Sequence, residues 1–430
     1  MPMLVLLLSI GVAALHTPQH GNQHCSHVSR RALAGAFAAA GLSGVLPTSA
    51  ATLLLTEDGV TLRSAEIYSV VPDSTKTLSP TVKPLTAGTI VKQLQQCRAV
   101  FLGEHHNSAA DHLLQSAVIR ELHKERGSLP MAVGLEAVQR RFQPALDSFV
   151  AGRIGEVELE EATEWRKRWF WPFAAYAPVF RACRELGIPL LALNVDSEDL
   201  SRVEVGGLPA LPPETLRSYV TDPEGFSAFA ATTAFKEYVA YIVKPSYQMH
   251  QRMGILRTTI TGQMLDEDMS FRNFFSGRVL WDESMGSASA AWCRNNPEGL
   301  LVGLVGSDHV KFGCGVPARC ARQLPGGLAS VASVMLNPLP SDTVRDPSIA
   351  GGPGGRLNFG EYILQLRYAP VPGDGGAPVI GSKPEDRERA AAVSQARVGS
   401  AVLPLADYLM FTTPPPLTKY TWVESSSIQS

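Results

Sequence analysis

Acidic residues are absent from the start of this chain. Glu57 is the first Asp or Glu among 430 residues, and Arg30 and Arg31 are the only basic residues before it. The apolar run Leu4 to Ala14 has the length of a signal-peptide hydrophobic region and is too short to span a bilayer as a helix. The arginine pair precedes a second apolar stretch that ends in small residues at Ala51, as in a twin-arginine export signal. We therefore expect residues 1–56 to be a targeting leader.

Two targeting signals in tandem are expected where a protein crosses several membranes in succession. The acid-free leader resembles the bipartite leaders that direct proteins into a plastid and on to the thylakoid lumen. The alternative is a simple secretory or periplasmic leader. A membrane anchor formed by the first apolar run is less favoured, because no positive charge precedes that run.

Cysteines are few and scattered. No two of the six form a C-x-x-C pair, which argues against a disulfide framework and against a structural zinc cluster. Cys314 and Cys320 are close enough in sequence to pair, although the loop would be short. Basic residues are not in excess either: 38 Lys and Arg stand against 40 Asp and Glu. A chain without a basic excess is not expected to bind nucleic acid.

Short, continuous apolar runs alternate with helical periodicity after the leader. Such runs are typical of buried parallel strands. The predicted strands are 99–102, 131–135, 190–193, 300–305, 329–336, 362–368 and 408–412. A long helical region is expected at 213–293, broken near Pro223, Pro245 and Gly277. Strands that alternate with helices predict an α/β sheet with helices on both faces.

We expect one α/β domain at residues 90–412. An N-terminal extension at 57–89 precedes it, and a loose tail at 413–430 follows it. Residues 337–358 and 369–386 are rich in Gly, Pro and Asp and are interpreted as loop insertions. No segment after the leader has the apolar length of a transmembrane helix, about 20 residues.

Polar side chains follow the predicted strands directly. The pattern G-x-x-H occurs after two of them, at 103–106 and 306–309, and Gly134-Leu135-Glu136 ends another. Ligands of open α/β sheets bind beyond the carboxyl ends of the strands. The candidate acid/base residues are Glu104, His106, Glu136 and His309. Three of them, His106, His309 and Glu136, are also candidate ligands of a divalent metal. The alternative is that polar residues simply gather where strands end.

Two further regions are candidate ligand contacts. Aromatic residues are dense between 165 and 180 and include Trp169, Trp171 and Tyr176. Such a cluster commonly forms a helical core, but flat rings also stack on planar ligands, and Tyr can ligate ferric haem. Gln263 and Asp266 are three residues apart on an expected helix, so they share one face. The alternative for that helix is a solvated acidic surface.

Taken together, these motifs resemble the ChaN-like haem-binding family, within a wider superfamily that includes erythromycin esterase, TraB and Tiki. The ordered motifs are Gly103-Glu104-His105-His106, Gly134-Leu135-Glu136, the aromatic stretch Trp169 to Phe180, Ala192-Leu193-Asn194, Gln263 to Met269, Gly306 to Val310 and Gly313 to Arg319. The resemblance implies a mixed, mainly parallel central sheet, haem binding and a homodimer that pairs cofactors.

By the same resemblance, Tyr176 is the best haem contact, with Tyr238, Tyr241 and Tyr247 as competitors. His105 stands where the family varies, so we expect it to be a neighbour of the working His106. Two functions follow. The first is a haem or tetrapyrrole carrier or sensor in a plastid or exported compartment. The second is a metal-dependent or acid/base hydrolase that uses the strand-end Glu and His side chains.

Overall fold

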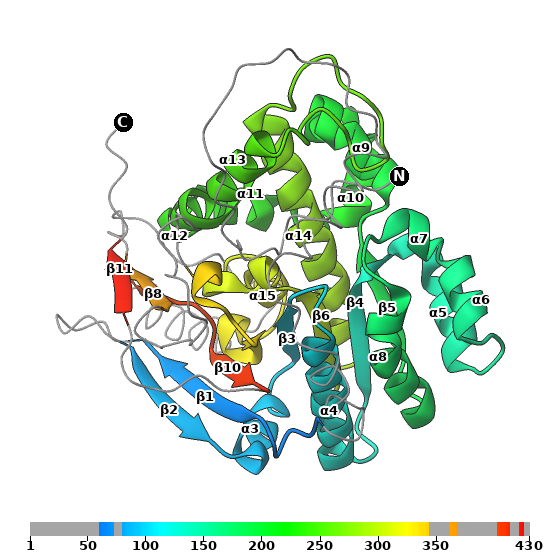
Figure 1. Cartoon of the computed structure of the whole chain (residues 1–430), viewed down its shortest axis with the longest axis vertical. Helices are drawn as coiled ribbons and strands as arrows, with labels where there is room; N and C mark the ends of the chain where they lie inside the picture. The colour runs from blue at the N-terminus through cyan, green and yellow to red at the C-terminus, as the bar shows by residue number, and fades with distance from the viewer. Residues whose placement is uncertain (1–59, 73–79, 344–361, 368–401, 413–420, 425–430) are drawn as a thin grey trace, which may run out of the picture.

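The computed structural model describes residues 60–72, 80–343, 362–367, 402–412 and 421–424. The expected leader lies outside the described residues, as do most of the two loop insertions and most of the tail. In the part that is described, a large sheet is covered by helices on both sides (Figure 1).

The large sheet has eight strands in the order β2-β1-β10-β7-β3-β6-β4-β5. Their bounds are β1 Glu66–Val71, β2 Thr81–Leu85, β3 Ala99–Glu104, β4 Met131–Gln139, β5 Leu190–Asn194, β6 Leu300–Gly306, β7 Val331–Leu336 and β10 Tyr408–Phe411. From β10 to β5 all neighbours are parallel, whereas β1 pairs antiparallel with both β10 and β2. The prediction of a mixed, mainly parallel sheet is confirmed.

The central strands are buried along their whole length. Every residue of β3, β4, β6 and β7 is buried, which is why these strands read as continuous apolar runs and not as alternating ones. The expected extension at 57–89 differs from the structure, which places β1 and β2 in the same sheet. Ile67 and Val70 anchor β1 in the core.

A smaller sheet has the order β11-β8-β9. It contains β8 Ile363–Arg367, β9 Val402–Pro404 and β11 Thr421–Glu424. The tail expected to be loose therefore includes one strand. None of the five described cysteines forms a disulfide, so Cys314 and Cys320 remain unpaired with each other.

Helices before and after β5 cover opposite faces of the sheet. α4 Ala109–Arg126 packs against α8 Phe173–Leu186 on one face, and α14 Phe271–Asn295 packs against α15 Val316–Ala321 on the other (Figure 1). This division follows from right-handed crossovers, because the chain moves outward from β3 to β4 and β5 and then returns to β6. Within the described residues, no helix has the length and hydropathy needed to cross a bilayer.

The long helical region is broken near Pro223 as expected, but not at Pro245 or Gly277. It contains α10 Pro213–Tyr219, α11 Pro223–Ala231, α12 Thr233–Tyr238, the π turn Val239–Val243 and α13 Lys244–Arg252. Pro223 begins a helix, whereas Pro245 lies just after the π turn, inside a helical run that continues from Thr233 to Arg252. Gly277 lies inside α14, where an added Cβ would be 3.3 Å from Leu200 Cδ1. The larger interruption is the loop 253–270.

Candidate functional site

The end of β3 carries a buried carboxylate surrounded by donors. Glu104 Oε1 accepts a hydrogen bond of 2.8 Å from the Tyr176 hydroxyl and lies 2.9 Å from His106 Nδ1. Its other oxygen accepts a hydrogen bond from Gln115 Nε2. His112 Nδ1 lies 3.5 Å from the same oxygen. Glu104 is 2% exposed and His106 is fully buried, so this group belongs to the interior.

A second buried group joins β4, β6 and α14. Glu136 Oε1 lies 3.1 Å from His309 Nε2, without the alignment of a hydrogen bond. Glu136 Oε2 accepts a hydrogen bond of 2.6 Å from the Gly306 N–H. On its other side, the His309 ring pairs through Nδ1 with Asp282 of α14. Asp282 also lies 3.6 Å from Arg278 Nε.

The two groups meet at Gly306. A Cβ added to this glycine would be 2.8 Å from His106 Nε2 and 3.5 Å from His309 Cδ2. The four strand-end side chains, Glu104, His106, Glu136 and His309, therefore lie together at the carboxyl edge of the sheet, as the spacing of the motifs predicts. We call them the strand-end cluster. Their chemical role stays a prediction.

Neighbouring charges and hydrogen bonds determine the ionisation of the two carboxylates of the cluster. Burial would raise the pKa of Glu104, but the charges of His112 and His106 and the hydrogen bonds from His106 and Gln115 lower the pKa to about 2. Burial would likewise raise the pKa of Glu136, but the charge of His309 lowers it. Both carboxylates are therefore ionised near neutral pH.

His309 is the cationic member. Burial and the charge of Arg278 would lower its pKa, but Glu136 and Asp282 raise it to about 8. At neutral pH the imidazole is mainly protonated and sits between two carboxylates. The imidazolium forms buried ion pairs with both carboxylates, and Arg278 beside Asp282 supplies a second positive charge.

The structure does not support the expected divalent metal. Within the described ranges, no group of three or more His, Cys, Asp or Glu side chains is placed to hold a metal ion. In the structure the imidazole of His309 is paired instead with Glu136 and Asp282. The described residues therefore give no support to the prediction that His106, His309 and Glu136 share a metal.

Aromatic rings close the cluster on the side of α8. The ring centroids of Trp169 and Trp171 lie 4.9 Å and 4.3 Å from that of His106. Trp169, Trp171 and Tyr176 are each no more than 5% exposed. The aromatic stretch is thus a packed core beside the cluster, which is the simpler of the two interpretations of its sequence.

The predicted haem tyrosines are engaged inside the protein. Burial and the charge of Glu104 raise the pKa of Tyr176 well above its usual value, so the tyrosinate that would ligate ferric iron is disfavoured. The hydroxyls of Tyr238, Tyr241 and Tyr247 donate to the backbone carbonyls of Asp308, Thr343 and Met269, respectively.

His105 points away from His106. Its Nδ1 lies 2.9 Å from Asp111 Oδ2 and its Nε2 lies 2.8 Å from Asp342 Oδ2. Burial would lower the pKa of His105, but these two carboxylates raise it well above the usual value. His105 therefore links the turn after β3 to the segment after β7, and it is a neighbour of His106 and not a member of the cluster.

Gln263 and Asp266 lie in the loop 253–270 and not on a helix. A bridge between Thr258 and Met264 and the left-handed backbone of Gly262, with φ of 87°, fold this segment back on itself. The helix prediction for these two residues is wrong. It rested on polar residues spaced three apart, but the chain forms a turn at Gly262, directly before Gln263. Both side chains are exposed.

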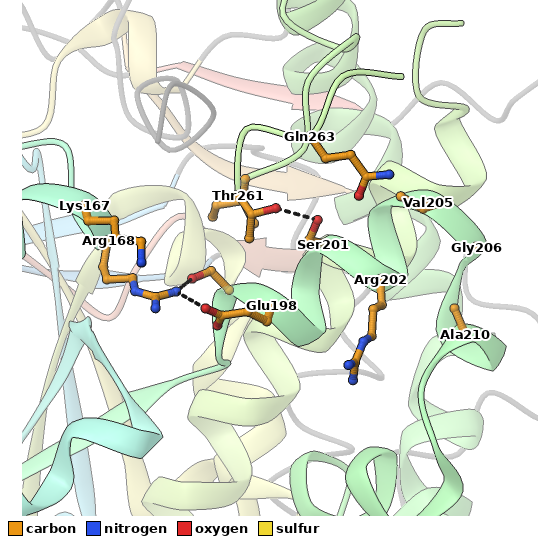
Figure 2. Close-up of a pocket in the computed structure, with 12 residues that line it drawn as sticks. Lys167, Arg168, Glu198, Ser201, Arg202, Val205, Gly206, Ala210, Thr261 and Gln263 are labelled. Atoms are coloured by element: carbon orange, nitrogen blue, oxygen red, sulfur yellow. Dashed lines mark hydrogen bonds and ion pairs between the residues drawn. The ribbon is translucent and has the colours of Figure 1, made fainter. Parts of the chain in front are cut away.

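Gln263 does line a pocket, which Figure 2 shows. The pocket runs along one face of α9 Ser197–Gly206, the helix that follows β5, and has a volume of about 710 Å³. We call it the α9 groove. Its lining residues are Lys167, Arg168, Ser197, Glu198, Ser201, Arg202, Val205, Gly206, Ala210, Ile260, Thr261 and Gln263. Asp266 is not among them.

Three cations and one carboxylate line the α9 groove. Arg168 is buried and held by Ser197 and Glu198, both at 2.6 Å. The side chains of Lys167 and Arg202 are 64% and 57% exposed, in surface ion pairs with Glu164 and Asp199. Such exposed pairs are weak and can rearrange.

Apart from Gln263, the groove residues carry no motif that marks them in the sequence, and neither does Asp282. Lys167 and Arg168 come directly before the aromatic stretch, and Ser197, Ser201 and Val205 recur every fourth residue. This spacing marks one helix face, but it does not show what the face borders. Asp282, similarly, resembles any polar position on a helix until the fold places it at His309.

Haem offers two kinds of contact, carboxylates on its edge and iron at its centre. The α9 groove fits the carboxylates, since Lys167 and Arg202 are exposed donors and Ser201 and Thr261 supply hydroxyls. It does not fit the iron: none of its twelve lining residues is a His, Tyr, Cys or Met, the side chains that ligate haem iron.

Comparison with known proteins gives one curated relative and several structural neighbours. The curated relative is the chloroplastic protein RETICULATA-RELATED 5 of Arabidopsis thaliana, 26% identical over 244 residues, which are 54% of this chain and 30% of that protein. The chain thus spans less than a third of the length of that relative.

Two solved structures illustrate the neighbours. One is ChaN of Campylobacter jejuni with cofacially bound haem, with a TM-score of 0.43 and 17% identity, covering 64% of this chain and 91% of that one. The other is a mutant of the erythromycin esterase EreC in its open conformation, with a TM-score of 0.35 and 15% identity, covering 76% and 93%.

A family model also matches residues 90–320, which contain the strand-end cluster and the α9 groove. The family is described as haem-binding uptake, Tiki superfamily, ChaN. Because the match extends over more than half of the 430 residues, this chain belongs to that ChaN-like haem-binding family.

Proposed function

We propose that this protein binds haem or a related tetrapyrrole in the α9 groove. The observation that carries the proposal is a groove of about 710 Å³ lined by exposed cations in a member of a haem-binding family. The volume lies in the range of ligand pockets, about 300–1,000 Å³. The groove also follows β5 at the carboxyl edge of the sheet, where α/β proteins bind ligands.

The experiment that tests the proposal is a titration of the full chain with hemin, followed by the Soret band. We expect Lys167→Gln and Arg202→Gln each to weaken binding about threefold to tenfold, since each removes a charge-assisted contact. Tyr176→Phe, the variant expected to matter if haem lies in the aromatic stretch, should leave the affinity unchanged. If only Tyr176→Phe weakens binding, haem is bound beside Trp169 and Trp171 and the groove is the wrong site.

We also propose a plastid location and a homodimer. The leader composition and the chloroplastic relative support the first, with the thylakoid lumen as the expected compartment. A fluorescent fusion to residues 1–56 tests it, and a secreted fusion would favour the export alternative. Light scattering with and without hemin tests the dimer.

The strand-end cluster favours a second candidate function, acid/base hydrolysis. The specific observation is a chain of buried groups, Asp282–His309–Glu136, beside His106, whose Nε2 makes no hydrogen bond. An imidazole oriented by a carboxylate, with its second nitrogen unengaged, is the form that a general base takes. His106 meets this description, since Glu104 holds its Nδ1.

For this function, the rings of Trp169 and Trp171 must move, because they cover His106. Hydrolysis of a generic ester by the full chain, compared with the His106→Asn variant, tests the candidate. Loss of turnover in the variant with an unchanged melting temperature supports catalysis. Equal rates for the two proteins contradict it.

A further inference from the structure

We infer that the α9 groove recognises a tetrapyrrole by its carboxylate edge and contributes no ligand to its iron, so that metal-free and iron porphyrins bind alike. The inference rests on the proposed function and specifies its ligand chemistry. The family is described as haem-binding, yet no side chain that lines the groove is of a kind that ligates haem iron.

The recognition surface is one face of a single helix. Ser197, Ser201 and Val205 follow one another at four-residue spacing on α9, and Arg202 lies beside them. Residues at this spacing are neighbours on a helix surface. In Figure 2, Lys167 and Arg168, which end α7 Trp165–Arg168, and the loop residues Thr261 and Gln263 lie around this face.

The exposed charges of the groove are Lys167, Arg202 and Glu198, whose side chains are 64%, 57% and 43% exposed. Glu198 is already engaged by Arg168 at 2.6 Å and by Arg141 at 2.7 Å. Lys167 and Arg202 are held only by surface ion pairs, at 3.2 Å and 3.1 Å. A carboxylate entering the groove meets two cations that can turn toward it, at the small cost of exchanging one exposed partner for another.

The remaining lining suits an apolar ring. Val205 is 46% exposed, and Ile260 and Ala210 line the same groove. Gly206 lets Ala210 approach, since an added Cβ would lie 2.9 Å from the Ala210 Cβ. An apolar side chain beside cations in one groove suits a ligand that is apolar in its body and anionic at its edge.

Two side chains of kinds that ligate haem iron lie outside the groove lining: Met264, which is 60% exposed, and Tyr219, which is buried. Met264 follows Gln263, and its thioether accepts a hydrogen bond of 3.4 Å from the Thr258 hydroxyl. Tyr219, which follows α9 in the chain, donates its hydroxyl to Asp199 at 2.9 Å. Affinity in the groove therefore comes from the edge of the ligand and from apolar contact with its ring.

The test uses the full chain and three probes: hemin, metal-free protoporphyrin IX, and protoporphyrin IX dimethyl ester, whose carboxylates are blocked. We expect the affinities for the first two to agree within about threefold, and the ester to bind about tenfold more weakly. Arg202→Gln should weaken the two acids and leave the ester unchanged. Arg166→Gln is the matched control, because Arg166 is an exposed cation in the same helix as Lys167, paired with Glu160 and outside the groove.

The outcomes separate the inference from the proposed function. Hemin that binds more than about tenfold tighter than metal-free porphyrin overturns the inference, because iron ligation then dominates, and leaves haem binding intact. An ester that binds as tightly as the acids also overturns it. If none of the three probes binds, the proposed function itself fails. Melting temperatures of the variants show whether a loss of binding reflects a loss of fold.

Discussion

At the scale of single residues, the strand-end cluster depends on close packing around one glycine. Gly306 is the last residue of β6, and its N–H donates to Glu136. With no side chain, it admits the rings of His106 and His309 on either side. The close packing of the cluster thus depends on the absence of a Cβ at position 306 as well as on its charges.

Gly306→Ala tests this packing. The new methyl group would lie 2.8 Å from His106 Nε2, and overpacking of this kind costs about 1–3 kcal/mol. Chemical denaturation measures the loss. Gly88→Ala in α3 Ala87–Leu94 is the control, because nothing lies within 4 Å of its added Cβ, and it should be neutral or stabilising by up to about 1 kcal/mol. Equal stability of the Gly306 variant and the parent would contradict the packing described here.

At the scale of elements, the α9 groove is built where a helix meets a loop. Glu204, on the buried face of α9, accepts a hydrogen bond of 2.7 Å from the Ile260 N–H and so attaches the loop 253–270 to the helix. Burial raises the pKa of Glu204 to about 8, although this hydrogen bond opposes the shift. Ionisation of Glu204 is therefore expected to destabilise the contact between α9 and the loop 253–270, which forms one wall of the groove.

Glu204→Gln should remove this dependence on pH. A buried carboxyl with a raised pKa loses stability relative to the unfolded chain as pH rises from about 4.5 to about 8. The variant keeps an oxygen to accept from Ile260 and cannot ionise, so its gain in melting temperature should grow over that interval and level off above it. Glu298→Gln, the same substitution at an exposed position outside the groove, serves as the matched control. A gain that is constant from pH 5 to pH 9 would show that Glu204 does not titrate in this range.

Some of these elements are predicted from the sequence and others are not. The buried strands β3, β4, β5 and β6 are predicted correctly, because continuous apolar runs leave little choice but a covered parallel strand. β2, with the sequence TVKPL and mainly exposed side chains, carries no such signal. The prediction at Gln263 is wrong for the opposite reason. The spacing of its polar residues is that of a helix, whereas the structure has a turn at Gly262.

At the scale of the whole molecule, the fold brings distant segments to one edge of the sheet. The sequence predicts that Glu104, His106, Glu136 and His309 meet there, because each follows or ends a parallel strand. It does not predict that aromatic rings would close this cluster. Nor does it predict the α9 groove, whose lining comes from residues 167–168, 197–210 and 260–263. Segments without a shared local pattern are brought together by tertiary structure alone.

The molecule combines a closed cluster with an open groove, and we propose that the ligand occupies the groove. Hydrogen–deuterium exchange of the full chain with and without hemin tests this claim most directly. We predict slower exchange in α9 and in residues 260–263 when hemin is bound, and unchanged exchange in α8. Slower exchange confined to residues 169–180, with α9 unchanged, would contradict the claim.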